Sequence, residues 1–218
     1  MFASIRKFIK SLLYPLYEWR LAKSLDFSKT PHHVGVILDG NRRWAKSNPT
    51  LYDPHGHKAG ASKIIDFLGW CEEADVKVVT LWLLSTDNFK RSQEEIDDLL
   101  KVIGETVDEL AATGRWNIKP VGALDLLPAW LADKLAALKP IRSDGVEVNV
   151  AISYGGRREI VDAVKSYMGE ELAAGHSLTD AAAKLTAEDI SKFLYTAGQP
   201  DPELLIRTSG EQRLGGFL

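Results

Sequence analysis

Short apolar runs alternate with helix-like segments along most of this chain, and this alternation limits its fold more than any other feature. Residues 34–38 and 76–84 are apolar and rich in β-branched side chains, as strands covered on both faces are. Between them, residues 58–74 place apolar side chains at three- and four-residue steps, which is the period of a helix. The remaining expected elements are helices over 92–113, 128–138, 157–168 and 187–195, and strands over 116–121, 146–153 and 204–206. This order predicts a single α/β domain with a mainly parallel central sheet flanked by helices.

Length and composition exclude several classes of protein. The chain has 218 residues, which is enough for one domain with a sizeable core. Its 27 basic and 30 acidic residues give a formal net charge of −3, so we expect no nucleic-acid partner. The single cysteine, Cys71, excludes a disulfide framework and any zinc or iron–sulfur site built from several cysteines. We expect a cytoplasmic protein, located in solution or at the inner face of the cell membrane.

Residues 1–29 differ from the rest of the chain, and we expect them to form an N-terminal arm ahead of a domain over 30–218. The arm carries six basic residues against two acidic ones, and its apolar residues recur at helical spacing. Pro15 is expected to bend this helix, and Lys10 interrupts the apolar stretch, which argues against a membrane span or a signal peptide. Two interpretations remain open: peripheral contact of residues 1–25 with anionic lipid, or packing on the same domain or a partner subunit.

Four polar clusters directly follow expected strands. They occupy residues 39–43, 85–88, 153–158 and 207–213, and they contain arginines, glycines, hydroxyl groups and an acid, Asp39, next to a strand. The carboxyl ends of parallel strands share one edge of a sheet, where α/β proteins bind their ligands. Arginine side chains and free backbone N–H groups are common ligands of phosphate groups. The sequence therefore predicts an anion site, most simply one for a diphosphate held together with a metal ion.

Residues 33–46, with the sequence HVGVILDGNRRWAK, resemble the signature of the cis-prenyltransferases, the undecaprenyl diphosphate synthase family. Four more segments follow in the order of that family, at 56–60, 85–91, 154–157 and 206–213. The resemblance implies a homodimer whose subunits join an allylic diphosphate to isopentenyl diphosphate, form a cis double bond and release diphosphate. It also implies Mg²⁺ as the cofactor, because negative charge grows on the leaving diphosphate. An apolar tunnel would hold the growing prenyl chain, and 30–218 would be the catalytic domain.

The resemblance also assigns roles to individual residues. Asp39 matches the essential aspartate that binds Mg²⁺ and diphosphate, and Asn88 and His57 fall near the reacting diphosphate and the departing proton. How these two residues divide their roles stays open. The residues after Asp39 would hold the allylic diphosphate, whereas Arg207 and Arg213 would hold that of isopentenyl diphosphate. The full set expected to bind the substrates is Gly40, Asn41, Arg42, Arg43, Trp44, Ser85, Thr86, Asp87, Phe89, Arg91, Arg207, Arg213 and Gly215.

Less specific interpretations of the same residues remain open. Taken alone, residues 39–41 are typical of an Asx turn, and His57 is typical of a histidine at a helix entry. Glu95 matches a family acid near the substrates, but Ser92 and Glu95 also have the spacing of a capping box. Trp44 is expected to pack at the wall of the site.

The chain departs from the common family pattern at several positions. Asp53 stands where many members carry an arginine for the allylic diphosphate, and Gly215 replaces a serine that often contacts isopentenyl diphosphate. Asp87 and Phe89 are smaller than the usual glutamate and tryptophan. Family members continue beyond the position of Leu218 with a glutamate that completes the Mg²⁺ site, and we expect that C-terminal segment to be missing here.

The expected strand over 76–84 predicts the length of the product. Leu83 falls at a position where long-chain members resemble one another in carrying a small residue. Because a protein interior is close-packed, the bulk of a leucine there is expected to shorten the space for the prenyl chain. Trp82 is a candidate for a second wall, although alternation along a strand places it on the side opposite to Leu83. Taken alone, both residues are also typical of the core of a buried strand. Residues 198–202 also resemble short-chain actinobacterial members of the family. We therefore expect a short-chain enzyme that makes (2Z,6E)-farnesyl diphosphate from geranyl diphosphate.

Three alternatives to this function differ from it in the residues that they require. A long-chain undecaprenyl or decaprenyl diphosphate synthase is expected if bulk at Leu83 does not stop elongation. A catalytically silent, membrane-bound partner subunit tends to lose Asp39 and the arginine motif at 207–213, both of which are present. A phosphohydrolase of the haloacid dehalogenase type needs a second carboxylate two residues after Asp39, where this chain has Asn41.

Overall fold

The computed structural model describes residues 2–47, 57–141 and 145–217. The chain divides into two compact units, Met1–Thr30 and Pro31–Leu218. Among the described residues, no helix combines the length and the apolar character that crossing a bilayer requires.

The smaller unit consists of one long helix and a short turn. The helix α1 (Phe2–Ser24) continues as a helix through Pro15, and the 3₁₀ turn η1 (Phe27–Lys29) follows it. Asp26 caps this turn, because its carboxylate accepts the amide hydrogen of Ser28 at 3.2 Å. The helix that the spacing of apolar residues predicts for the arm is therefore present.

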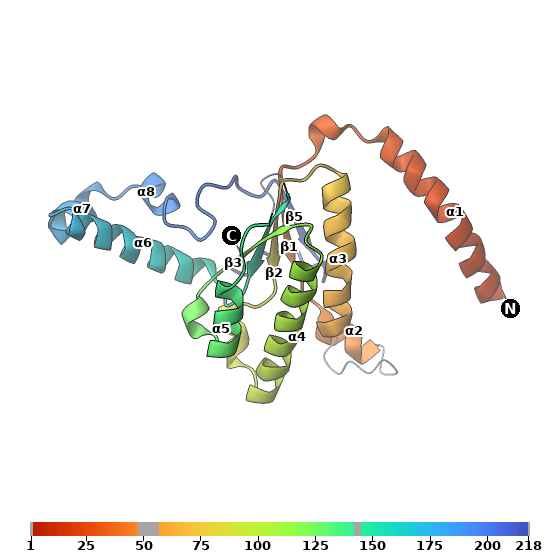
Figure 1. Ribbon diagram of the computed structural model, residues 1–218, viewed down its shortest axis with the longest axis horizontal. Coiled ribbons are helices and arrows are strands. Elements are labelled where there is room, and N and C mark those ends of the chain that lie inside the picture. Colours follow the sequence, from red (N-terminus) through yellow and green to blue (C-terminus); the bar gives the residue numbers. More distant parts are fainter. Residues whose placement is uncertain (1, 48–56, 142–144, 218) are drawn as a thin grey trace. The chain divides into compact units, whose positions relative to one another are not determined.

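The larger unit is built on a five-stranded sheet in which all the pairings are parallel (Figure 1). Each strand lies within two residues of a strand predicted from the sequence, so the α/β fold class with a parallel sheet and flanking helices is confirmed. The carboxyl ends of β2 (Val78–Trp82), β1 (His33–Ile37) and β5 (Leu204–Arg207) are neighbours, with β1 in the middle. The strands in spatial order are β3 (Asn117–Val121), β4 (Glu147–Ala151), β2 (Val78–Trp82), β1 (His33–Ile37) and β5 (Leu204–Arg207).

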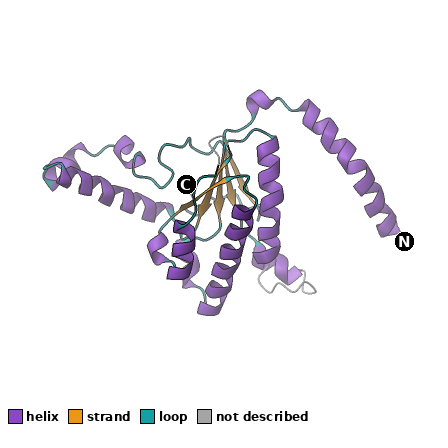
Figure 2. Cartoon of the chain, viewed as in Figure 1, coloured by secondary structure: helices purple, strands orange, loops and turns teal. Residues whose placement is uncertain are grey.

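Helices connect these strands, as Figure 2 shows. Short 3₁₀ turns, η2 (Thr86–Lys90) and η3 (Leu124–Leu126), follow β2 and β3. The helices of the larger unit are α2 (Asn41–Ser47), α3 (His57–Glu73), α4 (Gln93–Ala112), α5 (Ala129–Ala136), α6 (Gly156–Ala173), α7 (Leu178–Lys184) and α8 (Ala187–Ser191).

Two features of the last helices differ from the prediction. The helix α7 was not predicted; it begins where the hydroxyl of Ser177 accepts the amide hydrogen of Asp180 at 3.1 Å. The helix α8 ends at Ser191 rather than at residue 195. The reason is that the following residues form bonds of the i to i+3 type, such as that from the Phe193 amide to the Ile190 carbonyl at 3.0 Å.

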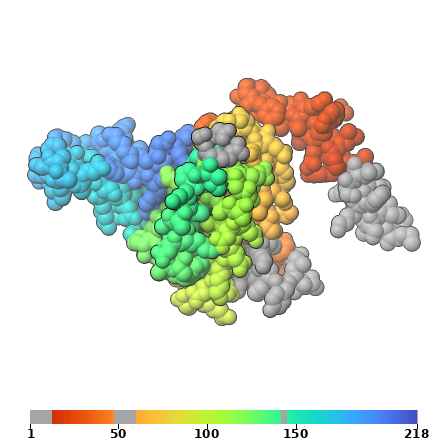
Figure 3. All heavy atoms as spheres, in the orientation of Figure 1, coloured from red at the N-terminus to blue at the C-terminus, as the bar shows by residue number. Residues whose placement is uncertain are grey.

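The helices α3, α4 and α5 cover one face of the sheet with a continuous apolar core. Val79 and Leu81 of β2 are buried against Leu68 of α3, Leu100 of α4 and Leu131 of α5. The helices α4 and α5 contact each other, and Figure 3 shows their atoms side by side on the surface of the molecule. Fully burying one such side chain contributes about 1.5–3 kcal/mol, so this layer is a major source of stability.

The opposite face of the sheet carries a buried chain of hydrogen bonds. His33 Nδ1 donates to the Pro200 carbonyl at 2.6 Å, so Nε2 is the acceptor and takes the hydroxyl hydrogen of Thr80 at 2.8 Å. Asn149 Nδ2 then donates to Thr80 Oγ1 at 2.9 Å and to Gln199 Oε1 at 2.6 Å. The strand predicted over 76–84 is thus buried on both faces as expected, and Thr80 is a polar residue that it places on this face. These bonds fix the loop that leads into β5.

Candidate functional site

The polar ends of β1, β2 and β5 meet along a cavity of about 440 Å³. Side chains of α3 and α4, such as Ile64, Leu99 and Ile103, form much of its apolar wall. The predicted cluster at 153–158 does not line this cavity, and Tyr154 is instead buried against Trp82 at 6.2 Å between ring centroids. The predicted polar residues that line the cavity are Asp39, Asn41, Ser85, Asp87, Asn88, Arg91, Arg207 and Arg213.

Asp39 lies directly after β1 and is held by hydrogen bonds to both carboxylate oxygens. Oδ1 accepts the amide hydrogen of Gly40 at 2.7 Å, and Oδ2 accepts from Nε and Nη2 of Arg207 at 3.1 and 2.6 Å. Burial alone would raise the pKa of Asp39, but hydrogen bonds from Arg207, Ser209 and Gly40 outweigh burial and lower this pKa below its ordinary value. The carboxylate is therefore ionised at neutral pH.

The turn after Asp39 is joined to the residues that follow β5. The Thr208 hydroxyl accepts the amide hydrogen of Asp39 at 2.9 Å and donates to the Asp39 carbonyl at 2.6 Å. Gly40 has a φ of +97°, and a Cβ added there would lie 3.4 Å from the Cβ of Ser209. A glycine at this position therefore lets the two chain segments approach closely.

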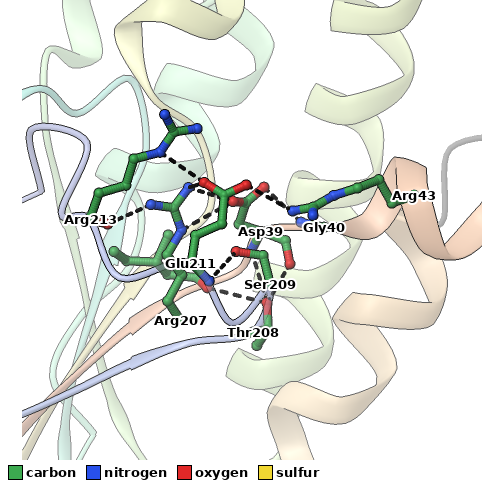
Figure 4. Close-up of polar contacts among 9 residues, drawn as sticks. Asp39, Gly40, Arg43, Arg207, Thr208, Ser209, Glu211 and Arg213 are labelled. Carbon is green, nitrogen blue, oxygen red and sulfur yellow. Dashed lines mark hydrogen bonds and ion pairs between the residues drawn. The ribbon is translucent and has the colours of Figure 1, made fainter.

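Three arginines from different segments converge beside Asp39 (Figure 4). Arg43 belongs to α2, Arg207 ends β5, and Arg213 lies in the loop beyond it. Glu211 lies among them: Oε1 is 3.2 Å from Nη2 of Arg43, and Oε2 is 3.3 Å from Nη2 of Arg207 and 2.8 Å from Nε of Arg213. The sequence reasoning gave Glu211 no role, although an acidic residue inside an arginine-rich motif was a visible signal.

A short turn positions Asn88 beside the cavity. Its Oδ1 accepts the amide hydrogen of Ser85 at 2.8 Å at the start of η2, and the amide of Thr86 donates to the Tyr154 carbonyl at 3.1 Å. Within the described part of the chain, the Nδ2 donor of Asn88 has no hydrogen-bond partner. The same turn places Asp87 on the surface, where a hydrogen bond from Lys90 lowers the pKa of its carboxyl group.

Glu95 connects two further arginines. Its Oε1 is 2.8 Å from Nη1 of Arg91 and 3.5 Å from Nη1 of Arg42. Ser92 accepts the amide hydrogen of Glu95 at 3.3 Å and thus caps α4, while the Glu95 carboxylate is used in the ion pairs. The structure therefore realises one half of the capping box, and the acid belongs to the arginine-lined part of the site.

Leu83 and Trp82 line the cavity from the end of β2. Leu83 packs against the core formed with α3 and α4, whereas the Trp82 ring stacks on Phe217 with centroids 4.9 Å apart and planes at 12°. The two side chains thus lie on opposite sides of the strand, as alternation predicted. Gly215 lies next to Trp82, and a Cβ added to it would be 3.9 Å from the ring, but its φ of +64° is a backbone conformation that favours glycine.

The remaining predicted residues lie at the margin of this arrangement or outside the described residues. Phe89 packs against the main core, and Trp44 lines a second pocket beside Asp39 and is 40% exposed. His57 is the first residue of α3, but its side chain is not among those described. Asp53 lies outside the described residues.

The donor atoms near Asp39 fit a metal ion that arrives together with a phosphate group. Among the described residues, no group of three or more His, Cys, Asp or Glu side chains is arranged to hold a metal ion. Mg²⁺ commonly binds through one or two carboxylates together with substrate phosphates and water. One ionised carboxylate surrounded by arginines provides that kind of site.

Comparison with known proteins places these residues in a family. A family model described as "Putative undecaprenyl diphosphate synthase" matches residues 37–218. The chain is 56% identical over 208 residues to the (2Z,6E)-farnesyl diphosphate synthase of Thermobifida fusca, covering 94% of this chain and 82% of the relative. It is 50% identical over 217 residues to isoprenyl transferase 1 of Streptomyces avermitilis, covering 99% of this chain and 84% of the relative.

The fold gives the same result. The structure matches that of lavandulyl diphosphate synthase from Lavandula x intermedia, solved in complex with dimethylallyl diphosphate. The TM-score is 0.73 at 30% sequence identity, and the match covers 87% of this chain and 82% of the other. By sequence, by fold and by the residues around Asp39, the chain belongs to the undecaprenyl diphosphate synthase family and is a cis-prenyltransferase.

Proposed function

We propose that the chain is a short-chain cis-prenyltransferase that condenses geranyl diphosphate with isopentenyl diphosphate to give (2Z,6E)-farnesyl diphosphate. The observation that carries this proposal is the Asp39–Arg207 pair at the polar part of a cavity whose remaining wall is apolar. The name of the relative from Thermobifida fusca supports the same product.

The side chains along the apolar wall of the cavity support a short product. Leu83, directly after β2, and Leu99 and Ile103 of α4 place bulky apolar side chains along this wall. A close-packed interior leaves no spare room beside such side chains, so they would limit the length of the prenyl chain.

Two groups of arginines are available for two diphosphates. We assign Arg207 and Arg213 to isopentenyl diphosphate and Arg42, Arg43 and Arg91 to the allylic diphosphate. Guanidinium groups form paired, charge-assisted hydrogen bonds with phosphate oxygens, so each group of arginines would fix the orientation of one substrate. The apolar wall would then hold the prenyl chain away from water.

Asp39 would hold Mg²⁺ together with diphosphate oxygens. When bound, the ion stabilises the negative charge that grows on the departing diphosphate. Before substrates arrive, Arg207 keeps the carboxylate ionised and oriented by two hydrogen bonds, at 3.1 and 2.6 Å. Asp39 is thus the residue whose loss is expected to cost most turnover.

Asn88 and His57 are given separate roles. Because Oδ1 of Asn88 is engaged by the Ser85 amide, its Nδ2 group is the donor that would orient a diphosphate oxygen. An amide does not take up a proton at neutral pH, so we assign the proton that leaves isopentenyl diphosphate to His57 at the start of α3.

The enzyme is also proposed to be a homodimer. The helices α6 and α7 expose several large apolar side chains, including Ile160, Leu172 and Leu178, at 50–55% of their surface. Covering such side chains favours association of two subunits. Light scattering coupled to gel filtration tests this point: a mass of two chains is expected, and Ile160→Asp should shift it toward one chain.

The primer preference and the product length test the proposed function. The chain is incubated with Mg²⁺, labelled isopentenyl diphosphate and either dimethylallyl, geranyl or farnesyl diphosphate, and the dephosphorylated products are sized by chromatography. Highest turnover with geranyl diphosphate and a product of three isoprene units are expected. Products of ten or eleven units would establish the long-chain alternative, and no incorporation with any primer would support the silent partner subunit.

A further inference from the structure

Glu211 contacts all three arginines that converge beside Asp39. Figure 4 shows Glu211 among these arginines. Both of its oxygens are used, at 2.8–3.3 Å from Arg43, Arg207 and Arg213. A carboxylate in this position uses the guanidinium groups that an incoming diphosphate would need. This competition would give Glu211 a role of its own, separate from the substrate-binding roles proposed for the arginines.

We propose that Glu211 is a displaceable counter-anion of the arginine cluster. It holds the three guanidinium groups together between turnovers, leaves Arg207 and Arg213 when isopentenyl diphosphate binds, and competes with the allylic diphosphate and with the released diphosphate for Arg43. This inference rests on the proposed function, because it requires a diphosphate as the ligand.

The balance of charge explains why the cluster needs a counter-anion. Three guanidinium groups face two carboxylates, those of Asp39 and Glu211. Arg207 is 14% exposed and is shared by both acids, so Asp39 alone would leave Arg43 and Arg213 without a neighbouring negative charge in the cluster. Like charges at this spacing repel one another, and the Glu211 carboxylate offsets that repulsion.

The exposure of the cluster explains why the counter-anion is displaceable. The side chains of Arg43 and Arg213 are 62% and 74% exposed, and that of Glu211 is 33% exposed. Ion pairs of this kind contribute little to stability because water and salt screen them. A diphosphate carries more charge and more acceptor oxygens than a carboxylate, so it is the stronger partner of the same arginines.

A purely structural role for Glu211 predicts the opposite result. If the carboxylate only braced the arginines, its removal would disorder the site, and the affinity for diphosphate would fall. If it competes with diphosphate, its removal raises that affinity. Loss of one negative charge within about 4 Å of the ligand site corresponds to roughly a fivefold tighter dissociation constant in water. The sign of the change therefore distinguishes the two roles.

The test measures binding of inorganic diphosphate to the whole chain by calorimetry, without turnover. Glu211→Gln removes the charge at nearly constant shape, and Glu211→Ala removes the side chain beyond Cβ as a second variant. The control is Glu105→Gln, which makes the same change in net charge at an exposed position in α4. We expect both Glu211 variants to bind diphosphate about five- to tenfold more tightly and the control to bind as the wild type does.

Steady-state kinetics provide a second readout that a bracing role would not give. In Glu211→Gln, the KM for isopentenyl diphosphate and the inhibition constant of diphosphate should both fall, and kcat should fall because the product leaves more slowly. Equal or weaker diphosphate binding by both Glu211 variants would overturn the counter-anion role. Absence of diphosphate binding by the wild type would overturn the proposed function itself, so the two failures are distinguishable.

Discussion

Replacing Leu83 by alanine should lengthen the product by about one isoprene unit. Leu83 lines the cavity at the end of β2 and packs against the core formed with α3 and α4. The substitution removes three carbon atoms, which frees roughly 90 Å³ at about 30 Å³ per atom. An isoprene unit has five carbons and needs roughly 150 Å³ on the same basis. The added space therefore takes up most of one further unit, but not several.

The same substitution should cost little enough stability to leave the protein folded. Because Leu83 is only partly buried, the loss of unfolding free energy is expected at the lower end of the range of about 2–5 kcal/mol for Leu→Ala. For a domain of this size, that loss lowers the Tm by roughly 4–8 °C. Activity is therefore measured well below the Tm of the variant.

The assay sizes the products that form from geranyl diphosphate and excess isopentenyl diphosphate. Leu83→Ile, which keeps the volume of the side chain, is the matched control and should give the product of the wild type. An unchanged product distribution for Leu83→Ala, in a protein that is folded and active, would refute the idea that this wall limits elongation.

Three further predictions concern the metal site, the arm and the second face of the sheet. Asp39→Ala should lower kcat by at least about a thousandfold. The Tm should stay close to that of the wild type, because Arg207 keeps Glu211 as a partner. Near-normal turnover of this variant would remove Asp39 from the mechanism. The full chain should sediment with phosphatidylglycerol vesicles at low salt and less at high salt, and deletion of residues 1–25 should abolish sedimentation but spare activity on geranyl diphosphate. Sedimentation that survives this deletion would favour packing of the arm on protein. Burial lowers the pKa of His33 below its ordinary value of 6.5. Below about pH 6.5, the unfolded chain therefore takes up a proton at His33 that the folded chain does not, and the free energy of unfolding should fall as the pH drops. Urea unfolding at pH 7.5 and 5.5 should show a smaller pH dependence in His33→Asn, and an unchanged dependence would exclude His33 as its source.

The strands were predictable from sequence because of how parallel sheets are buried. Strands covered on both faces are continuous apolar runs, and those at 34–38 and 76–84 located β1 and β2 within two residues. The helix α7 gave no such signal, since nearly all its residues are exposed and its start depends on the cap at Ser177. The hydrogen bonds of Thr80 were also not predictable, because its partners His33 and Asn149 lie on other strands.

The site was predictable to the extent that topology alone determines it. Asp39 and Arg207 are 168 residues apart, yet both follow apolar runs, and parallel pairing of β1 with β5 brings them to hydrogen-bonding distance. The position of Glu211 among the arginines depends on how the loop beyond β5 folds, which no periodicity specifies. The roles of His57 and Asp53 stay predictions, because neither side chain is among those described.

The configuration and the length of the first condensation product test the central claim most directly. The chain is supplied with Mg²⁺, geranyl diphosphate and labelled isopentenyl diphosphate, and the dephosphorylated product is compared by chromatography with authentic (2Z,6E)- and (2E,6E)-farnesol. The account predicts (2Z,6E)-farnesol as the main product, since a cis-prenyltransferase forms a Z double bond and the wall around Leu83 would stop elongation after one condensation. A product with an E double bond at the new position, or a ladder of much longer chains, would contradict it.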